Sequence, residues 1–260
     1  MKKMVLFDLD DTILWDKKSV QDAFDLTCRL AEKEAGTNPV ELEKNVRTRA
    51  RELYASYPTY AYTQKIGINP FEGLWATFED PGEEFRKLRE IAPVYQEKAW
   101  LEGLKDTGAD LPELAKKLAE AFRSYRIESP HLFEDALSVL TELGKDYRLA
   151  LVTNGSPSLQ NLKLEISSEL PPYFEKIFIS GDIGTGKPDP EIFHHVLQHL
   201  AIDPEEAVMV GDNLNTDIIG ANRTGIDSVW LNRFDAENRT DIEPAYEIKS
   251  LTELKNILQS

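Results

Sequence analysis

Short apolar runs alternate with amphipathic stretches through the second half of the chain. After residue 128 the apolar runs are RLALV (148–152), IFIS (177–180), AVMV (207–210) and SVWL (228–231). Between them apolar residues recur at helical spacing, as in residues 190–200. Apolar strands separated by helices are typical of a parallel sheet covered on both faces. The pattern therefore predicts an α/β fold with a doubly wound parallel sheet, to which residues 4–8 add a strand.

The segment from residue 16 to 127 has a different pattern, in which charged and aromatic side chains accompany apolar residues at helical spacing. Four helices are predicted there, enough for a small bundle. Because the strand at 4–8 has no second strand soon after it, we interpret this segment as an insertion. We expect a Rossmann-like core formed by residues 1–15 and 128–260, and an inserted all-helical domain formed by residues 16–127.

Local signals place some of the helix ends. Asn38, Pro39 and Glu41 form a start signal that consists of a cap, a first-turn proline and a capping-box acid. A later helix in the insertion is expected to bend or restart near Pro93, because proline breaks the helical hydrogen-bond ladder. An apolar stripe over residues 132–140 predicts the first helix after the insertion.

Composition excludes several classes of partner. The formal net charge of −16 argues against a nucleic acid or an anionic membrane surface, although a local site could still bind an anionic small molecule. Cys28 is the only cysteine, so no intrachain disulfide can form. The apolar run after the N-terminal MKK is interrupted by Asp8 within a few residues, and no stretch reaches membrane-spanning length. We expect a cytoplasmic protein without a membrane partner; the sequence does not indicate its oligomeric state.

Three acids, Asp8, Asp10 and Asp11, are crowded into four positions directly after the first apolar run. Like charges this close raise carboxylate pKa values unless a positive charge is near. The triplet is therefore either a solvated turn or one side of a cation site.

Other polar residues follow the later strands, and ligands of open α/β sheets bind beyond the carboxyl ends of strands. Thr153 and Asn154 follow one strand, Asp212 follows another, and Lys187 lies in a Gly-rich turn after a third. The predicted sheet would bring these side chains to the same edge as Asp8.

Two other motifs in the sequence suggest different sites. Residues 181–188, GDIGTGKP, nearly match a P-loop, but Pro188 offers neither a hydroxyl for Mg²⁺ nor an N–H for phosphate. His195 and His199 share a helix face at the spacing of zinc ligands, with His194 beside them. No acid of the HExxH type accompanies them, so we expect surface or packing histidines.

Four motifs in this order resemble those of the haloacid dehalogenase superfamily: DLDDT (8–12), LVTNG (151–155), GTGKPDP (184–190) and GDNLNTD (211–217). The resemblance covers residues 1–14 and about 128–260, and the insertion lies where that family carries a helical cap domain. In its general pattern the chain is similar to the branch with pyrimidine-nucleotidase-like and N-acylneuraminate-phosphatase-like members.

The resemblance implies a role for each of these residues. Asp8 would attack phosphorus and form an aspartyl-phosphate, and Asp10 would act as acid and then as base. Mg²⁺ would be held by the Asp8 carboxylate, the Asp10 backbone carbonyl and Asp212. Lys187, the Thr153 hydroxyl and the Asn154 backbone N–H would bind phosphoryl oxygens, with Asp217 behind them, touching Lys187 or a metal-bound water. Asp11 would be a turn acid without a catalytic task.

We therefore expect a Mg²⁺-dependent phosphomonoesterase that acts on a small phosphorylated metabolite. A sugar phosphomutase of the same superfamily remains an alternative, as does a ligand-binding or regulatory module that kept the fold without turnover. The sequence does not identify the substrate, because specificity would lie in the insertion and its loops.

Overall fold

The computed structural model describes residues 2–259, and the chain forms two compact units. The sheet unit comprises Met1–Trp15, Leu132–Gly155 and Ser167–Ser260, and the helical unit comprises Asp16–His131 and Ser156–Ile166. The chain thus passes from one unit to the other four times, after Trp15, His131, Gly155 and Ile166. Residues 156–166, which the sequence pattern groups with the α/β part, belong by their contacts to the helical unit.

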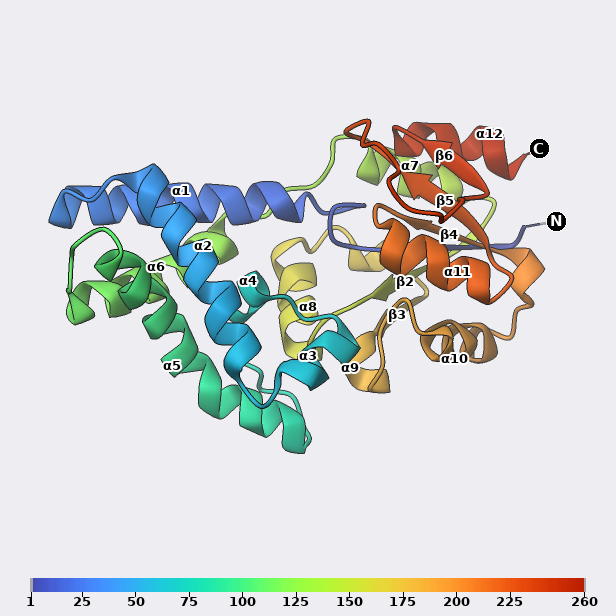
Figure 1. Ribbon diagram of the computed structural model, residues 1–260. Helices are drawn as coiled ribbons and strands as arrows, with labels where there is room; N and C mark the ends of the chain where they lie inside the picture. Colours follow the sequence, from blue (N-terminus) through green and yellow to red (C-terminus); the bar gives the residue numbers. More distant parts are fainter. Residues whose placement is uncertain (1, 260) are drawn as a thin grey trace. The chain divides into compact units, whose positions relative to one another are not determined.

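The sheet unit is built on six parallel strands within the described residues (Figure 1). They are β1 (Met4–Phe7), β2 (Arg148–Thr153), β3 (Lys176–Ile179), β4 (Ala207–Gly211), β5 (Asp227–Leu231) and β6 (Tyr246–Ile248), arranged in the order β3-β2-β1-β4-β5-β6. Leu6 of β1 is in register with Ala150 of β2 and Met209 of β4. The predicted doubly wound α/β sheet is confirmed.

Helices cover this sheet, as a parallel topology requires. They are α7 (Ala136–Leu143), α9 (Ser180–Ile183), α10 (Pro190–Leu200), α11 (Ile219–Arg223) and α12 (Leu254–Leu258), with single turns η1 (Pro171–Tyr173), η2 (Pro204–Glu206), η3 (Leu214–Ile218) and η4 (Leu251–Glu253). Met4 and Leu6 pack with Phe193 and Val196 of α10 in one buried cluster. The Asp189 carboxylate accepts the Glu191 N–H at 2.9 Å and so caps α10.

The helical unit consists of α1 (Asp16–Ala35), α2 (Pro39–Ser56), α3 (Tyr60–Ile66), α4 (Pro70–Gly73), α5 (Glu83–Lys105), α6 (Pro112–Glu128) and α8 (Pro157–Ile166). The predicted start of α2 is confirmed, because the Asn38 side chain accepts hydrogen bonds from two backbone N–H groups of the first turn. In its core, the rings of Phe24 and Phe122 lie 4.7 Å apart, and Trp100 lies 5.8 Å from each of them. Aromatic burial of this kind stabilises a small bundle.

Three details differ from the sequence-based predictions. Helix α5 continues through Pro93, so of the two predicted outcomes, a bend or a restart, the restart is wrong. The apolar stripe at 132–140 is helical only from Ala136. The residues before it pair with the turn that follows β1 instead: Leu132 forms a β-bridge with Leu14, and the Phe133 N–H donates to Ile13 O. Strand β6 was not predicted, since YEI at the sheet edge has no apolar run. No helix within residues 2–259 is both long and apolar enough to span a membrane.

Candidate active site

The order of the strands determines where a ligand-binding site can form at the edge of the sheet. From β1 the chain builds outward through β2 and β3 on one side, and then through β4, β5 and β6 on the other. At such a switch point the loops leave in opposite directions and open a crevice beyond the strand ends. Asp8 directly follows β1, Thr153 ends β2, and Asp212 directly follows β4. These three predicted residues therefore come from three adjacent strands at the same edge.

Lys187 lies at the centre of this cluster. Its Nζ donates to Asp8 Oδ1 at 2.6 Å and to the backbone oxygen of Val152 at 2.7 Å, and it lies 2.7 Å from Asp217 Oδ1. Only 2% of the lysine side chain is exposed. Two hydrogen bonds and one further ion pair therefore fix the position of the lysine.

The charges of Asp8, Lys187 and Asp217 shift the pKa values of Asp8 and Lys187. Burial raises the pKa of Asp8, the Lys187 charge lowers it and the Asp217 charge raises it again, so that the pKa of Asp8 is about 6. Burial alone would lower the pKa of Lys187, but Asp217 and Asp8 outweigh it, and the pKa of Lys187 lies above its usual range. Lys187 therefore remains charged at neutral pH, while Asp8 is costly to ionise without a further cation.

A threonine connects the turn after β1 to the turn after β4. Thr12 Oγ1 donates to Asp8 Oδ2 at 3.1 Å and accepts the Asp212 N–H at 3.1 Å. Its side chain is fully buried, and Trp230 supports the same turn by donating from Nε1 to Asp212 O at 2.9 Å. Sequence reasoning gave Thr12 no role, although its place as the last residue of DLDDT was a usable signal.

The residues between Asp8 and Thr12 form a tight turn. The Asp11 N–H donates to Leu14 O at 2.6 Å, and the Leu14 N–H donates to Leu9 O at 2.9 Å. Asp11 adopts a left-handed conformation with φ 63°, which aspartate tolerates better than most residues. Asp10, in the same turn, is half-buried. This geometry gives Asp11 a conformational reason to be an aspartate.

Asn154 holds the lysine segment through its side chain. Its Oδ1 accepts the Lys187 N–H at 2.8 Å, and its Nδ2 donates to Lys187 O at 2.9 Å. The Gly155 N–H donates to Ser180 Oγ at 2.9 Å, and the φ of 147° at Gly155 is one that other residues rarely adopt. The sequence predicted only a backbone role for Asn154, whereas this two-point pairing fixes the lysine loop on the end of β2.

Asp217 lies close to the end of β4 because Gly211 has no side chain there. A single turn of π-helix, η3, carries Asp217, and its Oδ2 accepts the Asn213 N–H at 3.1 Å. A Cβ atom on Gly211 would lie 2.3 Å from Asp217 Cγ, so a larger residue cannot occupy that position. Asp217 is 1% exposed and contacts Lys187 directly, which was one of the two positions considered for it.

One carboxylate cluster suits a metal ion. Asp8, Asp212 and Asp217 each offer an oxygen, and these atoms lie within 4.8 Å of one another, the one such group of three or more in residues 2–259. The three carboxylates carry more negative charge than the one ammonium group of Lys187 offsets, so the cluster favours a divalent cation with oxygen ligands. His195 and His199 instead pack against the ring of Phe178, with ring centroids 6.1 and 5.4 Å away.

Comparison with known proteins identifies the family of this chain. The family model of haloacid dehalogenase-like hydrolases matches residues 2–225. The chain belongs to this family. This hydrolase also has solved relatives of the same fold.

Three similar proteins indicate the breadth of the family around this hydrolase. A phosphoserine phosphatase of Thermus thermophilus is 38% identical over 232 residues, which is 89% of each chain. An N-acylneuraminate-9-phosphatase of Rattus norvegicus is 38% identical over 165 residues, covering 62% of this chain and 66% of that protein. The crystal structure of the Bacillus subtilis HAD-hydrolase YfnB, bound to magnesium, has a TM-score of 0.67 at 26% identity and covers 100% of this chain and 99% of its own.

Proposed function

We propose that this haloacid dehalogenase-like hydrolase is a Mg²⁺-dependent phosphomonoesterase that acts on a small phosphorylated metabolite through an aspartyl-phosphate on Asp8. The observation that carries the proposal is the environment of Asp8. Lys187 and Thr12 each bind one of its oxygens, at 2.6 and 3.1 Å, at the switch point of the sheet. The similarity to a phosphoserine phosphatase and to an N-acylneuraminate-9-phosphatase supports a phosphate ester as substrate.

The acidic cluster fits the metal that this activity requires. The Asp8 and Asp212 carboxylates, with the Asp10 backbone carbonyl, would hold Mg²⁺, and Asp217 would remain with Lys187. When bound, the ion would offset the negative charge that a phosphate ester brings into a carboxylate site. The magnesium in the YfnB crystal structure supports this choice of ion.

The chemistry needs two transfers of the phosphoryl group. In the first, a carboxylate oxygen of Asp8 bonds to phosphorus while the ester bond breaks, and Asp10 gives its proton to the departing oxygen. In the second, Asp10 takes a proton from water, the water oxygen bonds to phosphorus, and the bond to Asp8 breaks. The products are an alcohol and inorganic phosphate, and both aspartates return to their starting states.

Other polar groups would bind the phosphoryl oxygens during both steps. The Lys187 ammonium offers a fixed positive charge, and the Thr153 hydroxyl with the Asn154 backbone N–H offers neutral donors. In this proposal residues 16–127 are the cap domain that selects the leaving group, while residues 1–15 and 128–260 carry out the chemistry.

Phosphate release from 4-nitrophenyl phosphate tests this function. We expect turnover with Mg²⁺ and a loss of at least about 100-fold with a chelator, because the carboxylate cluster then repels the ester. The matched control is Asp11→Asn, which removes a charge from the same turn and should keep activity within about threefold. Release that is equally fast with and without divalent cations would exclude the metal-dependent mechanism, and no release at all would favour a binding module.

A further inference from the structure

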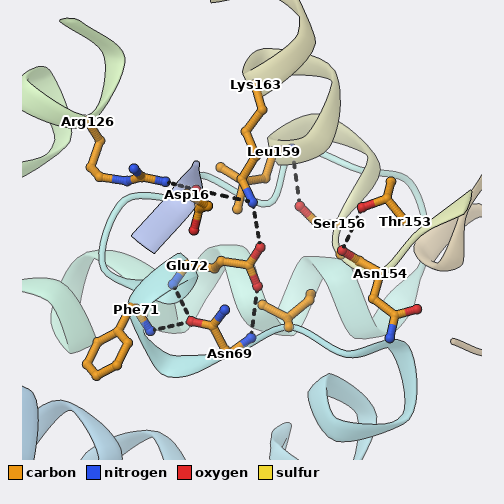
Figure 2. Close-up of polar contacts among 12 residues, drawn as sticks. Asp16, Asn69, Phe71, Glu72, Arg126, Thr153, Asn154, Ser156, Leu159 and Lys163 are labelled. Carbon is orange, nitrogen blue, oxygen red and sulfur yellow. Dashed lines mark hydrogen bonds and ion pairs between the residues drawn. The ribbon is translucent and has the colours of Figure 1, made fainter. Parts of the chain in front are cut away.

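Buried ion pairs occur in both units of the chain, and those of the helical unit connect helices to one another. Figure 2 shows Lys163 of α8 next to Glu72 of α4, at a distance of 2.9 Å. In the same unit, Arg126 of α6 donates to Asp16 of α1 at 2.6 Å. A buried ion pair in the sheet unit has a further contact, which is with the candidate active site.

The pair in the sheet unit is formed by Asp135, directly before α7, and Arg233, two residues after β5. Arg233 donates from Nη1 and Nη2 to the two carboxylate oxygens of Asp135, at 3.0 and 2.9 Å. The two side chains are only 14% and 11% exposed. Burial would raise the pKa of Asp135, but hydrogen bonds from Arg233 and Ser250 lower it below its usual value. Asp135 is therefore ionised at neutral pH and holds the guanidinium group in one orientation.

Neighbouring segments of the sheet unit hold both partners of this pair. The Leu251 N–H donates to Asp135 Oδ2 at 2.9 Å, and the Ser250 hydroxyl donates to the same oxygen at 2.8 Å. The guanidinium carbon of Arg233 lies 3.9 Å from the centre of the Phe133 ring, which is a cation–π contact. The start of η4 and the segment before α7 thus fix the position of the arginine.

The third polar contact of Arg233 is with the turn that follows β1. Its Nη2 donates to the backbone oxygen of Thr12 at 3.2 Å. The Thr12 hydroxyl in turn donates to Asp8 Oδ2 and accepts the Asp212 N–H, at 3.1 Å in both cases. Arg233 therefore holds the main chain of the residue whose side chain joins the proposed nucleophile to a proposed metal ligand.

Stability alone does not account for an arginine at position 233. Its Nε is buried and has no hydrogen-bond partner within residues 2–259, and an unsatisfied buried donor destabilises a fold. Buried ion pairs can often be replaced by apolar side chains without a loss of stability. A lysine could pair with Asp135, but it lacks the planar fork that reaches two carboxylate oxygens and a carbonyl group together. The residue type therefore fits the three contacts better than it fits a need for stability.

We propose that Arg233 is a positioning residue for the active site. Held by Asp135, it fixes Thr12 and thereby the spacing of the two aspartates that follow β1 and β4. The inference rests on the proposed function, in which Asp8 and Asp212 hold Mg²⁺. All of these contacts lie within the sheet unit. The proposal thus gives a role in the reaction to a residue outside the four motifs.

The Mg²⁺ concentration that gives half-maximal phosphatase activity tests the proposal. Arg233→Met is made together with Asp135→Asn, so that no buried charge loses its partner. In this double variant we expect the half-maximal Mg²⁺ concentration to rise about tenfold, because the two aspartates are no longer held at the spacing that the ion requires. The KM for 4-nitrophenyl phosphate should change less than about threefold.

The matched control uses an arginine with the same set of contacts at the other edge of the sheet. Arg148, the first residue of β2, donates to both carboxylate oxygens of Glu175 and to the Leu200 backbone oxygen. The double variant Arg148→Met, Glu175→Gln removes these contacts far from the carboxyl ends of the strands. It should change neither the half-maximal Mg²⁺ concentration nor the KM.

Hydrogen exchange supplies a readout that needs neither metal nor turnover. In Arg233→Met, Asp135→Asn we expect the protection of the Asp212 N–H to fall at least about tenfold, because its acceptor on Thr12 is no longer fixed. Amide protection in β2 should stay unchanged, and the metal-free melting temperature should stay close to that of the parent protein. These results together would separate a local loss of position from a general loss of stability.

The proposal is overturned if the folded double variant at Arg233 and Asp135 responds to Mg²⁺ like the parent protein, or if its Asp212 N–H is as well protected. It is also overturned if the control variant at Arg148 and Glu175 shows the same changes. A parent protein without phosphatase activity, in which the Asp212 N–H nevertheless loses protection, would contradict the proposed function and leave the positioning role intact.

Discussion

Asp8→Asn is expected to abolish turnover and, without metal, to stabilise the fold. Loss of a catalytic nucleophile costs on the order of 10⁴-fold or more in rate. The pKa of Asp8, raised from 3.8 to about 6, means that the fold disfavours the ionised carboxylate. The resulting free-energy penalty grows as the pH rises from the pKa of Asp8 in the unfolded chain to its pKa in the folded protein, and above that pH it stays constant. At neutral pH it amounts to about 3 kcal/mol, and asparagine removes it while keeping an oxygen for Lys187.

Thermal unfolding in the presence of a chelator measures this effect. At pH 7 the melting temperature of Asp8→Asn should exceed that of the parent protein, and the difference should narrow at about pH 4.5. Mg²⁺ should then stabilise the parent more than the variant, since the variant lacks one carboxylate ligand. The assignment of Asp8 would fail if the variant kept turnover within about tenfold, or if it melted below the parent at pH 7.

Lys187→Met is expected to be both inactive and strongly destabilised. The ammonium group is the partner of Asp8, Asp217 and the Val152 carbonyl, all within 2.7 Å. Breaking a buried ion pair by removing one partner typically costs about 3–5 kcal/mol. The loss should therefore be of this size at neutral pH, should shrink as acid protonates Asp8, and Mg²⁺ should partly restore the stability.

Denaturant unfolding at two pH values checks this expectation. Lys176→Met is the matched control, because Lys176 is an exposed lysine on β3 of the same sheet. Its free energy of unfolding should change by less than about 0.5 kcal/mol. A Lys187→Met protein as stable as that control would mean that the lysine does not offset the charges of the two aspartates.

Local patterns were sufficient to predict the parallel sheet and to select the candidate site residues at its edge. The apolar run before Asp8 specified a buried strand, and capping residues such as Asn38 specified a helix start, because both depend on neighbours in the sequence. The interpretation of Asp8, Thr153, Lys187 and Asp212 as one constellation depended on the parallel order of the strands. The structure brings these residues to the same edge of the sheet.

Long-range contacts were out of reach of the same reasoning. Thr12 bonds to Asp212, which is 200 residues away in the sequence, and although its place in the DLDDT motif was a usable signal, no local pattern names this partner. Two partners of α8, Asp80 and Glu72, lie in the insertion, and no local pattern of residues 157–166 indicates these contacts. The π-helical turn that carries Asp217 also has no periodicity signal.

Rapid-quench mass spectrometry of Asp10→Asn with 4-nitrophenyl phosphate tests most directly whether Asp8 carries the phosphoryl group during turnover. A good leaving group needs little help from an acid, whereas hydrolysis of the adduct needs the base, so this variant should accumulate the aspartyl-phosphate. We predict a phosphoryl adduct on the peptide that contains Asp8, and none in the Asp8→Asn, Asp10→Asn double variant. An active Asp10→Asn protein with no adduct on that peptide, or with an adduct on another residue, would contradict the mechanism.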